Sequence, residues 1–306
     1  MPLLKVVFLG IDNAGKSSIL NIIEEKYSLV SNPQPTTRIE RHDELTDIFG
    51  YDIISWDIPG QSVLREDYVF QIDRTLEETG MIIYVIDVQD TKRIDESLEF
   101  YEKVLQKLRN DKIIPFISVF IHKTDPDIKD DPEIIANTER IKKAISELSS
   151  GFEVDFSKTT IFDRWTLYLA FSYALKKLLA KDKQQEVQQI LREFAQNNDL
   201  EAILLLDDKN FLLNDYLPTQ EVQNLLQDLA LICTFIYKTA VENKLSTNRV
   251  KIDLNQETIL LHPITINEKL FFLMALTPNA QKEIAPQLDQ LVSKLSKIPI
   301  EYFNPK

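Results

Sequence analysis

The chain has 306 residues, of which 44% are hydrophobic and 27% are charged, and its formal net charge is −13 at pH 7. Such a chain can bury a sizeable core, and its length favours about two domains. The acidic balance argues against an extended basic groove for nucleic acid and against general attraction to anionic membranes. A single cysteine excludes a disulfide framework within the chain.

The N-terminal region carries the most specific motif. An apolar run at 4–9 predicts a buried strand, the pattern at 17–25 predicts a helix, and the segment between them fits G-x-x-x-x-G-K-[ST]. In such a loop the glycines let backbone N–H groups approach a phosphate, the lysine reaches the β and γ oxygens, and the serine hydroxyl holds Mg²⁺. We therefore predict nucleotide contacts along the loop from Asp12, Asn13, Ala14, Gly15, Lys16, Ser17 and Ser18.

Strand and helix patterns then alternate. Strands are expected at 40–49, 51–57, 81–87, 113–121 and 152–156, and helices at 67–78, 94–108 (capped by Thr91), 132–148 and 162–179. The first two strands, separated at Gly50, are typical of a hairpin. The alternation predicts an α/β domain with a mostly parallel sheet, whose ligand sites lie at the carboxyl ends of the strands.

The pattern changes after the glutamine-rich segment 181–185. Helices are expected at 185–197, 219–241 and 278–297, and strands at 202–206, 211–217, 249–254, 258–264 and 270–276. This order, α-β-β-α-β-β-β-α, predicts a second α+β domain with an antiparallel sheet. We place the two domains at 1–182 and 183–306, and we expect Cys233 to be a core residue of the second.

Polar residues follow the strand expected at 51–57. Asp57 is placed to touch Mg²⁺ through water, the Gly60 amide to sense a γ-phosphate, and Gln61 to orient an attacking water. Thr36, in the Pro-interrupted segment before the hairpin, can complete the Mg²⁺ shell, and Thr37 competes for this role.

A later strand ends in His122, Lys123 and Asp125. The aliphatic stem of Lys123 can cover a base. Asp125 can accept hydrogen bonds from the N1–H and the exocyclic amine of guanine, an arrangement that adenine cannot match. Alone, the motif at Asp57 is typical of an ordinary strand-to-turn exit, and the motif at 122–125 is typical of a charged loop. Their order, each at a strand end, favours a guanine nucleotide site.

These motifs resemble a known family. The phosphate loop at 10–17 and the segment 56–61 look like those of Arf proteins. The His122-Lys123-Thr124-Asp125 motif, the loop at 159–163 and the element order of the C-terminal region resemble the Rag/Gtr family of Ras-like small GTPases, whose C-terminal domain is of the roadblock type. The resemblance thus implies a P-loop GTPase domain followed by a roadblock-like dimerisation domain.

The resemblance implies a GTP/GDP switch with Mg²⁺ in which Lys16 and Gln61 support slow hydrolysis. The Thr160–Ile161 backbone would contact guanine O6, and Thr36 and Gly60 would read the γ-phosphate. It further implies a homo- or heterodimer through the C-terminal domain, activating and exchange proteins, and a roadblock-type scaffold.

Three residues depart from the pattern of most Rag/Gtr proteins or of most small GTPases. Asp12 places a carboxylate near the phosphates, as in Arf proteins. Pro59 replaces the usual first glycine of a Gly-Gly-Gln run, and His122, although found in Rag/Gtr proteins, stands where most small GTPases have asparagine.

Two other functions stay open. One is a nucleotide-stabilised scaffold with little or no GTPase activity, favoured by Pro59. The other is an Arf-like trafficking GTPase with an added longin-type domain, a fold that patterning separates poorly from roadblock. With no signal peptide, no membrane-length apolar run and Pro2 in place of a myristoylated glycine, we expect a cytoplasmic protein without a direct membrane anchor, which reaches a membrane only through partners.

Overall fold

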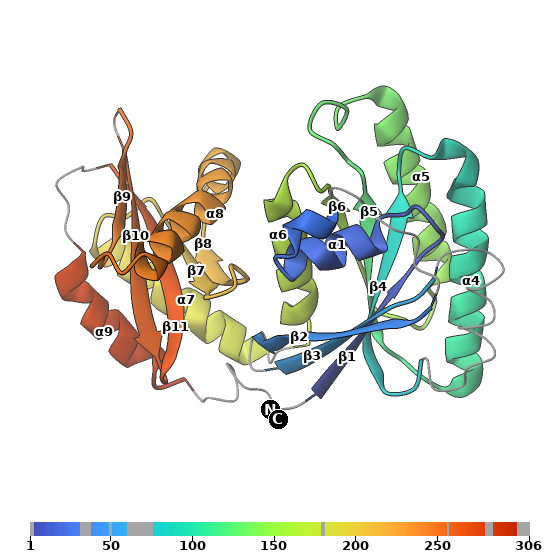
Figure 1. Cartoon of the computed structure of the whole chain (residues 1–306), viewed down its shortest axis with the longest axis horizontal. Helices are drawn as coiled ribbons and strands as arrows, with labels where there is room; N and C mark the ends of the chain where they lie inside the picture. The colour runs from blue at the N-terminus through green and yellow to red at the C-terminus, as the bar shows by residue number, and fades with distance from the viewer. Residues whose placement is uncertain are drawn as a thin grey trace. The chain divides into compact units, whose positions relative to one another are not determined.

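The computed structural model describes residues 3–30, 38–48, 51–59, 76–178, 181–255, 257–278 and 284–298. The chain forms two compact units, Met1–Asp47 with Tyr51–Ala170, and Ile48–Gly50 with Phe171–Lys306. Each unit is built on a sheet of its own (Figure 1). Among the described residues, none of the helices is both long enough and apolar enough to span a bilayer.

The first unit contains a six-stranded sheet in the order β2-β3-β1-β4-β5-β6. Its strands are β1 (Leu3–Leu9), β2 (Glu40–Ile48), β3 (Tyr51–Asp57), β4 (Thr79–Asp87), β5 (Phe116–His122) and β6 (Val154–Thr159). The β3–β1, β1–β4, β4–β5 and β5–β6 pairings are parallel. Because helices cover both faces, β4 and β5 are apolar and buried along nearly their whole length. This sheet confirms the predicted α/β fold.

Helices α4 (Ile94–Asp111) and α5 (Pro132–Leu148) cover one face, and α1 (Lys16–Ile23) and α6 (Arg164–Lys176) cover the other (Figure 1). A short helix α2 (Tyr27–Val30) follows α1. Since α1 leaves β1 and α4 leaves β4 toward opposite faces, the carboxyl ends of these two adjacent strands form a topological switch point. Ligands of α/β sheets bind at such points.

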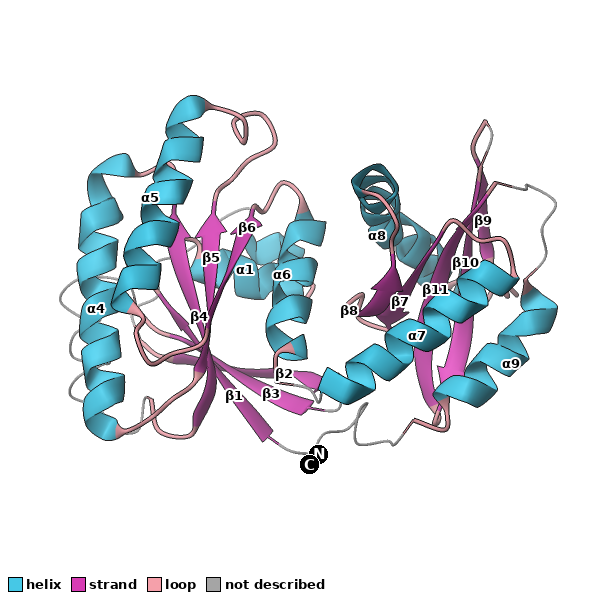
Figure 2. Cartoon of the chain, turned by 180° about the vertical axis from the view of Figure 1, so that it is seen from behind, coloured by secondary structure: helices cyan, strands magenta, loops and turns pink. Residues whose placement is uncertain are grey.

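The second unit is an antiparallel five-stranded sheet in the order β8-β7-β11-β10-β9. Its strands are β7 (Ala202–Asp207), β8 (Leu212–Tyr216), β9 (Val250–Asp253), β10 (Thr258–Ile266) and β11 (Lys269–Thr277). Helices α7 (Lys181–Asn197) and α9 (Ala285–Leu295) lie side by side on one face, and α8 (Gln220–Glu242) lies on the other (Figure 2). Cys233 is buried in α8, as expected.

The last turns of α6 pack within the second unit. The Phe171 ring lies 5.5 Å from that of Phe211, and the Leu212 amide donates to Ser172 Oγ at 2.9 Å. The polar segment 181–185, which composition marks as a seam, forms the first turns of α7.

Several sequence predictions about local structure were wrong; strand β5, for example, begins at Phe116 and not at residue 113. Thr91 does not cap α4, because it begins a 3-10 turn, η2 (Thr91–Arg93), and α4 starts only at Ile94. Its hydroxyl instead donates to Glu133 Oε1 at 2.9 Å and accepts from Asn137 Nδ2 at 3.0 Å. The edge strand β6 begins two residues later than predicted. The helix expected at 67–78 lies largely outside the described residues.

Candidate nucleotide-binding site

Two glycines set the backbone of the loop that joins β1 to α1. Gly10 has a φ of 145°, and a Cβ there would lie 2.2 Å from the Val85 carbonyl oxygen. Gly15 has a φ of 100° and is the N-cap of α1, with no side-chain hydrogen bond to the helix. The first turn of α1 therefore presents its N–H groups to the loop, which is the arrangement that binds phosphate.

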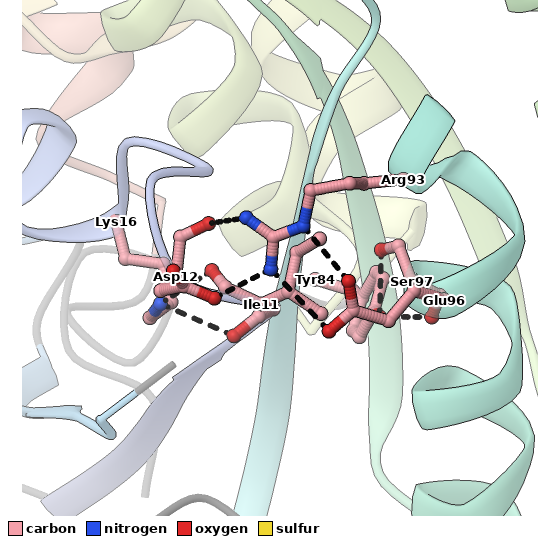
Figure 3. A network of polar contacts seen from close by, with 8 residues as sticks. Ile11, Asp12, Lys16, Tyr84, Arg93, Glu96 and Ser97 are labelled. Atoms are coloured by element: carbon pink, nitrogen blue, oxygen red, sulfur yellow. Dashed lines mark hydrogen bonds and ion pairs between the residues drawn. The ribbon is translucent and has the colours of Figure 1, made fainter. Parts of the chain in front are cut away.

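Lys16 holds a positive charge inside this loop. Its side chain is buried, and Nζ donates to the Gly10 and Ile11 carbonyl oxygens at 3.1 and 3.0 Å (Figure 3). The ammonium thus lies beside the backbone that would receive phosphates, as the motif predicts. Of the other predicted loop residues, Asn13 is exposed, Ala14 is buried, and Asp12 and Ser18 are half-buried.

Ser17 and Asp57 meet at the carboxyl edge of the sheet. Asp57 ends β3 and is fully buried, and the Ser17 hydroxyl donates to Asp57 Oδ2. The sequence separates these residues by 40 positions, and the parallel β1–β3 pairing brings them together. A hydroxyl and a carboxylate are both oxygen donors of the kind Mg²⁺ takes, so the pair fits the predicted metal site.

Four residues with predicted roles lie outside the described residues: Thr36, Thr37, Gly60 and Gln61. Their roles stay sequence predictions. Pro59, directly before this segment, is buried beside the core residue Ile58.

Asp125, the predicted base-selecting residue, is held from two sides. Gln89 Nε2 donates to its Oδ2 at 2.8 Å, and the Thr160 hydroxyl donates to its Oδ1. Gln89 Nε2 also donates to the Lys123 carbonyl oxygen at 2.7 Å. Both donors are neutral, so they orient the carboxylate without removing its charge, and an anionic acceptor is what the two N–H groups of guanine need.

The loop around Thr160 is closed by local hydrogen bonds. The Thr160 amide donates to Thr166 Oγ1 at 3.1 Å, and the Phe162 amide donates to Thr160 Oγ1 at 3.2 Å. Ile161, between them, is half-buried. This fixes the backbone of Thr160 and Ile161 next to Asp125, where the O6 contact is predicted.

His122 lies between the two loops. Its ring is buried, Nδ1 lies 2.9 Å from Thr159 Oγ1, and a Cβ on Gly15 would lie 2.5 Å from its Cδ2 atom. Burial, assisted by the neighbouring Lys123 charge, lowers the pKa of His122 to about 3, so the ring is neutral. A neutral ring thus packs against the phosphate loop while bonding to the end of β6.

Three residues that sequence analysis missed complete the polar network. Asp87, at the end of β4, pairs with Lys123 at 2.7 Å between Oδ2 and Nζ. Gln89 orients Asp125, as described above, and Arg93 contacts Asp12 in the phosphate loop. Asp87 is the last residue of β4 and Gln89 lies two residues after it. The sequence therefore places both at a strand end, as it does Asp57 and Asp125, and this pattern could have predicted them.

A glycine-bounded loop that fits the phosphate-loop motif, between the first strand of a mostly parallel sheet and a helix, is typical of a P-loop nucleotide-binding domain. The family model described as "Gtr1/RagA G protein conserved region" matches residues 5–236. The chain belongs to this Rag/Gtr family of small GTPases, which confirms the resemblance drawn from its motifs.

Individual relatives agree with this assignment. The mouse and human proteins named Ras-related GTP-binding protein C are each 28% identical over 245 residues, which cover 76% of this chain and 57% of theirs. ADP-ribosylation factor-like protein 3 of Chlamydomonas reinhardtii is 33% identical over 123 residues, 40% of this chain and 63% of its own. The chain therefore spans little more than half the length of its Rag relatives.

Proposed function

We propose that the chain is a molecular switch that binds GTP and GDP with Mg²⁺ and hydrolyses GTP slowly. This proposal rests on two groups of residues at the carboxyl edge of the same sheet. Lys16 and the Ser17–Asp57 pair form the first group, and the Asp125 carboxylate, oriented by its hydrogen bonds, is the second. The first group suits phosphates and a metal ion, and the second suits guanine.

The residues take distinct roles in this proposal. The loop amides and Lys16 bind the β- and γ-phosphates, while Ser17 and, through water, Asp57 hold Mg²⁺. Asp125 accepts from guanine N1–H and the exocyclic amine, and the stem of Lys123 covers the base. The ion pair between Lys123 Nζ and Asp87 keeps that stem in place.

Hydrolysis rests on the sequence predictions for Thr36, Gly60 and Gln61. Gln61 orients the attacking water, and Thr36 and Gly60 sense the γ-phosphate. The arginine that contacts the phosphate loop, Arg93, donates to Asp12 and Glu96, so we expect it to hold the loop rather than to act as an arginine finger. Efficient turnover then depends on an activating protein, and GDP release on an exchange protein.

Single-turnover hydrolysis by the purified, GTP-loaded chain with Mg²⁺ tests this proposal. We expect slow conversion to GDP, and Gln61→Leu should bind GTP as well as the wild type while losing most of the conversion. A Gln61→Leu variant that hydrolyses GTP at the wild-type rate would contradict the role of Gln61. Failure of the wild type to load GTP would refute the guanine site itself.

The buried Pro59 favours a second candidate function, a scaffold stabilised by nucleotide. Proline fixes φ and removes an N–H, which restricts the segment after β3. Limited proteolysis with GDP and with a non-hydrolysable GTP analogue separates the two functions. Different cleavage at 30–40 and 60–75 between the two nucleotides supports the switch, and identical cleavage supports the scaffold.

We further propose that the second unit pairs with another roadblock-like domain, in a homo- or heterodimer. On α8, Ile232, Phe235 and Ile236 are 49%, 67% and 44% exposed, while the Tyr237 ring packs edge-on against Phe272 of β11 at 5.2 Å. Helix α8 thus presents apolar side chains on its solvent side as well as toward the sheet, which is typical of a partner-binding helix.

Sedimentation velocity with Phe235→Asp tests the pairing. We expect the variant to remain monomeric at concentrations where the wild type, alone or with a related chain, dimerises. Ile114→Asp is the matched control, since Ile114 is an apolar residue of the first unit that is 76% exposed. Loss of pairing in both variants would contradict a role for α8. In this proposal, a scaffold that binds the dimer recruits it to a membrane.

A further inference from the structure

Arg93 contacts the phosphate loop from outside the motif. Its Nη2 atom donates to Asp12 Oδ1 at 2.6 Å, and Nη1 lies 3.4 Å from the Asp12 carbonyl oxygen (Figure 3). The two residues are 81 positions apart. One guanidinium therefore binds both the side chain and the backbone of a loop residue.

The guanidinium is held in this orientation from behind. Its Nε donates to Glu96 Oε2 at 2.8 Å, and its Nη2 to Glu96 Oε1 at 3.3 Å. Glu96 lies in the first turn of α4, and that turn is attached to the sheet because the buried Tyr84 hydroxyl donates to the Ser97 carbonyl oxygen. Arg93 is thus oriented by a rigid element before any ligand binds.

The contact between Arg93 and Asp12 offsets a negative charge in the phosphate loop. Asp12 adds a carboxylate to the segment that must receive phosphates, and like charges at short range repel. Lys16 lies on the inner side of the loop, where it donates to the Gly10 and Ile11 carbonyl oxygens. Without Arg93, the carboxylates of Asp12 and Glu96 would face this side of the loop with no guanidinium between them.

We propose that Arg93 is a positioning residue that fixes Asp12 and neutralises its carboxylate, so that a phosphate loop carrying its own negative charge still accepts a nucleoside triphosphate. This inference rests on the proposed function, because it presumes that guanine nucleotides bind the loop. It concerns nucleotide affinity, and GTP should be more sensitive than GDP, since GTP carries one more charged phosphate.

Dissociation constants for GTP and GDP, measured with Mg²⁺ by displacement of a fluorescent guanine nucleotide, test the inference. Arg93→Ala should weaken GTP binding about tenfold, which corresponds to ~1.4 kcal/mol, and should weaken GDP binding less. Asp12→Asn alone removes the loop carboxylate while Arg93 keeps its positive charge and its hydrogen bonds to Glu96, and it should tighten GTP binding severalfold. The double variant should return to within about threefold of the wild type, and raising the salt concentration should shrink each difference.

Arg140→Ala is the matched control. Arg140 Nη2 also donates to a carboxylate in the first turn of α4, that of Asp95, but Arg140 lies on α5 and this ion pair does not involve the phosphate loop. We expect this variant to bind GTP like the wild type. Equal weakening in Arg140→Ala would mean that Arg93 acts only through the stability of α4.

The outcomes separate this inference from the proposed function. If the wild type binds neither GTP nor GDP, the proposed function fails. If the wild type binds both, the inference is overturned either by Arg93→Ala binding GTP unchanged or by a loss that Asp12→Asn does not restore. Should Arg93→Ala fail to fold, the expected gain in Asp12→Asn still decides the matter, and unchanged or weaker GTP binding there would overturn the inference.

Discussion

The contact between Gly15 and His122 allows a quantitative prediction. Gly15 has a φ of 100°, and an added Cβ would lie 2.5 Å from His122 Cδ2 and 2.8 Å from Nε2. The ring has little room to move, because it is buried and bonded to Thr159 Oγ1 at 2.9 Å. Gly15→Ala therefore introduces both backbone strain and overpacking.

The structure supplies a control that separates the two costs. Gly151 has a similar φ of 91°, and a Cβ there would meet nothing within 4 Å. Left-handed strain costs roughly 1–2 kcal/mol at either position, and overpacking adds about 1–3 kcal/mol at Gly15 alone. We therefore expect Gly15→Ala to lower the free energy of unfolding by ~1–3 kcal/mol more than Gly151→Ala does.

Thermal unfolding without nucleotide measures this difference, since bound ligand would add its own contribution. For a unit of this size, each kcal/mol corresponds to about 2–4 °C in Tm. In a His122→Ala background, the cost of Gly15→Ala should fall to that of Gly151→Ala, because the clash is gone. Equal costs for the two glycine substitutions, or the same Gly15→Ala cost in both backgrounds, would refute the reasoning.

Three further predictions concern other residues. Gln61→Leu should lose most single-turnover GTP hydrolysis while its GTP dissociation constant, measured by nucleotide displacement, stays at the wild-type value. The hydrogen bond from Glu24 raises the pKa of His42, so its stabilising contribution is complete below the unfolded pKa of about 6.5 and is lost as the pH rises through the folded value. Urea unfolding should accordingly show a larger deficit for His42→Asn at pH 6 than at pH 8.5, and a constant deficit would contradict this. Burial raises the pKa of Asp207 to about 7, so the stability it contributes in its protonated form falls as the pH rises from about 4 to about 7. Asp207→Asn should remove that dependence and stabilise the chain at pH 8 by up to ~4 kcal/mol, measured by the same urea titrations.

Local patterns in the sequence predicted much of the fold. The apolar run of β4 and the Asp131-Pro132 start of α5 are local signals, and α5 spans the predicted residues 132–148. The edge strand β6 was placed less well because it pairs only with β5 and its residues are half-buried, which weakens the hydrophobic pattern. The first turns of α7 were missed because residues 181–185 are polar on all sides.

The candidate site likewise contains residues that local motifs predict and contacts that only the tertiary structure reveals. Lys16, Asp57 and Asp125 could be predicted as candidates because each lies in a motif at a strand end. Arg93 was missed because its partner Asp12 lies 81 positions away, and no periodicity connects residues across that separation. The packing of His122 against Gly15 also depends on tertiary structure, since it requires the end of β5 to lie beside the start of α1.

The central claim, a guanine nucleotide site built from the phosphate loop and Asp125, is tested most directly by an equilibrium titration. The purified chain, with Mg²⁺, is titrated with GTP, GDP and ATP. A site that hydrogen-bonds the base through an oriented acceptor rejects a base lacking those donors by a factor of roughly 10⁴, so we expect GTP and GDP to bind and ATP to bind at least about a thousandfold more weakly. ATP binding as tight as that of GTP, or no binding of any of the three, would contradict the account.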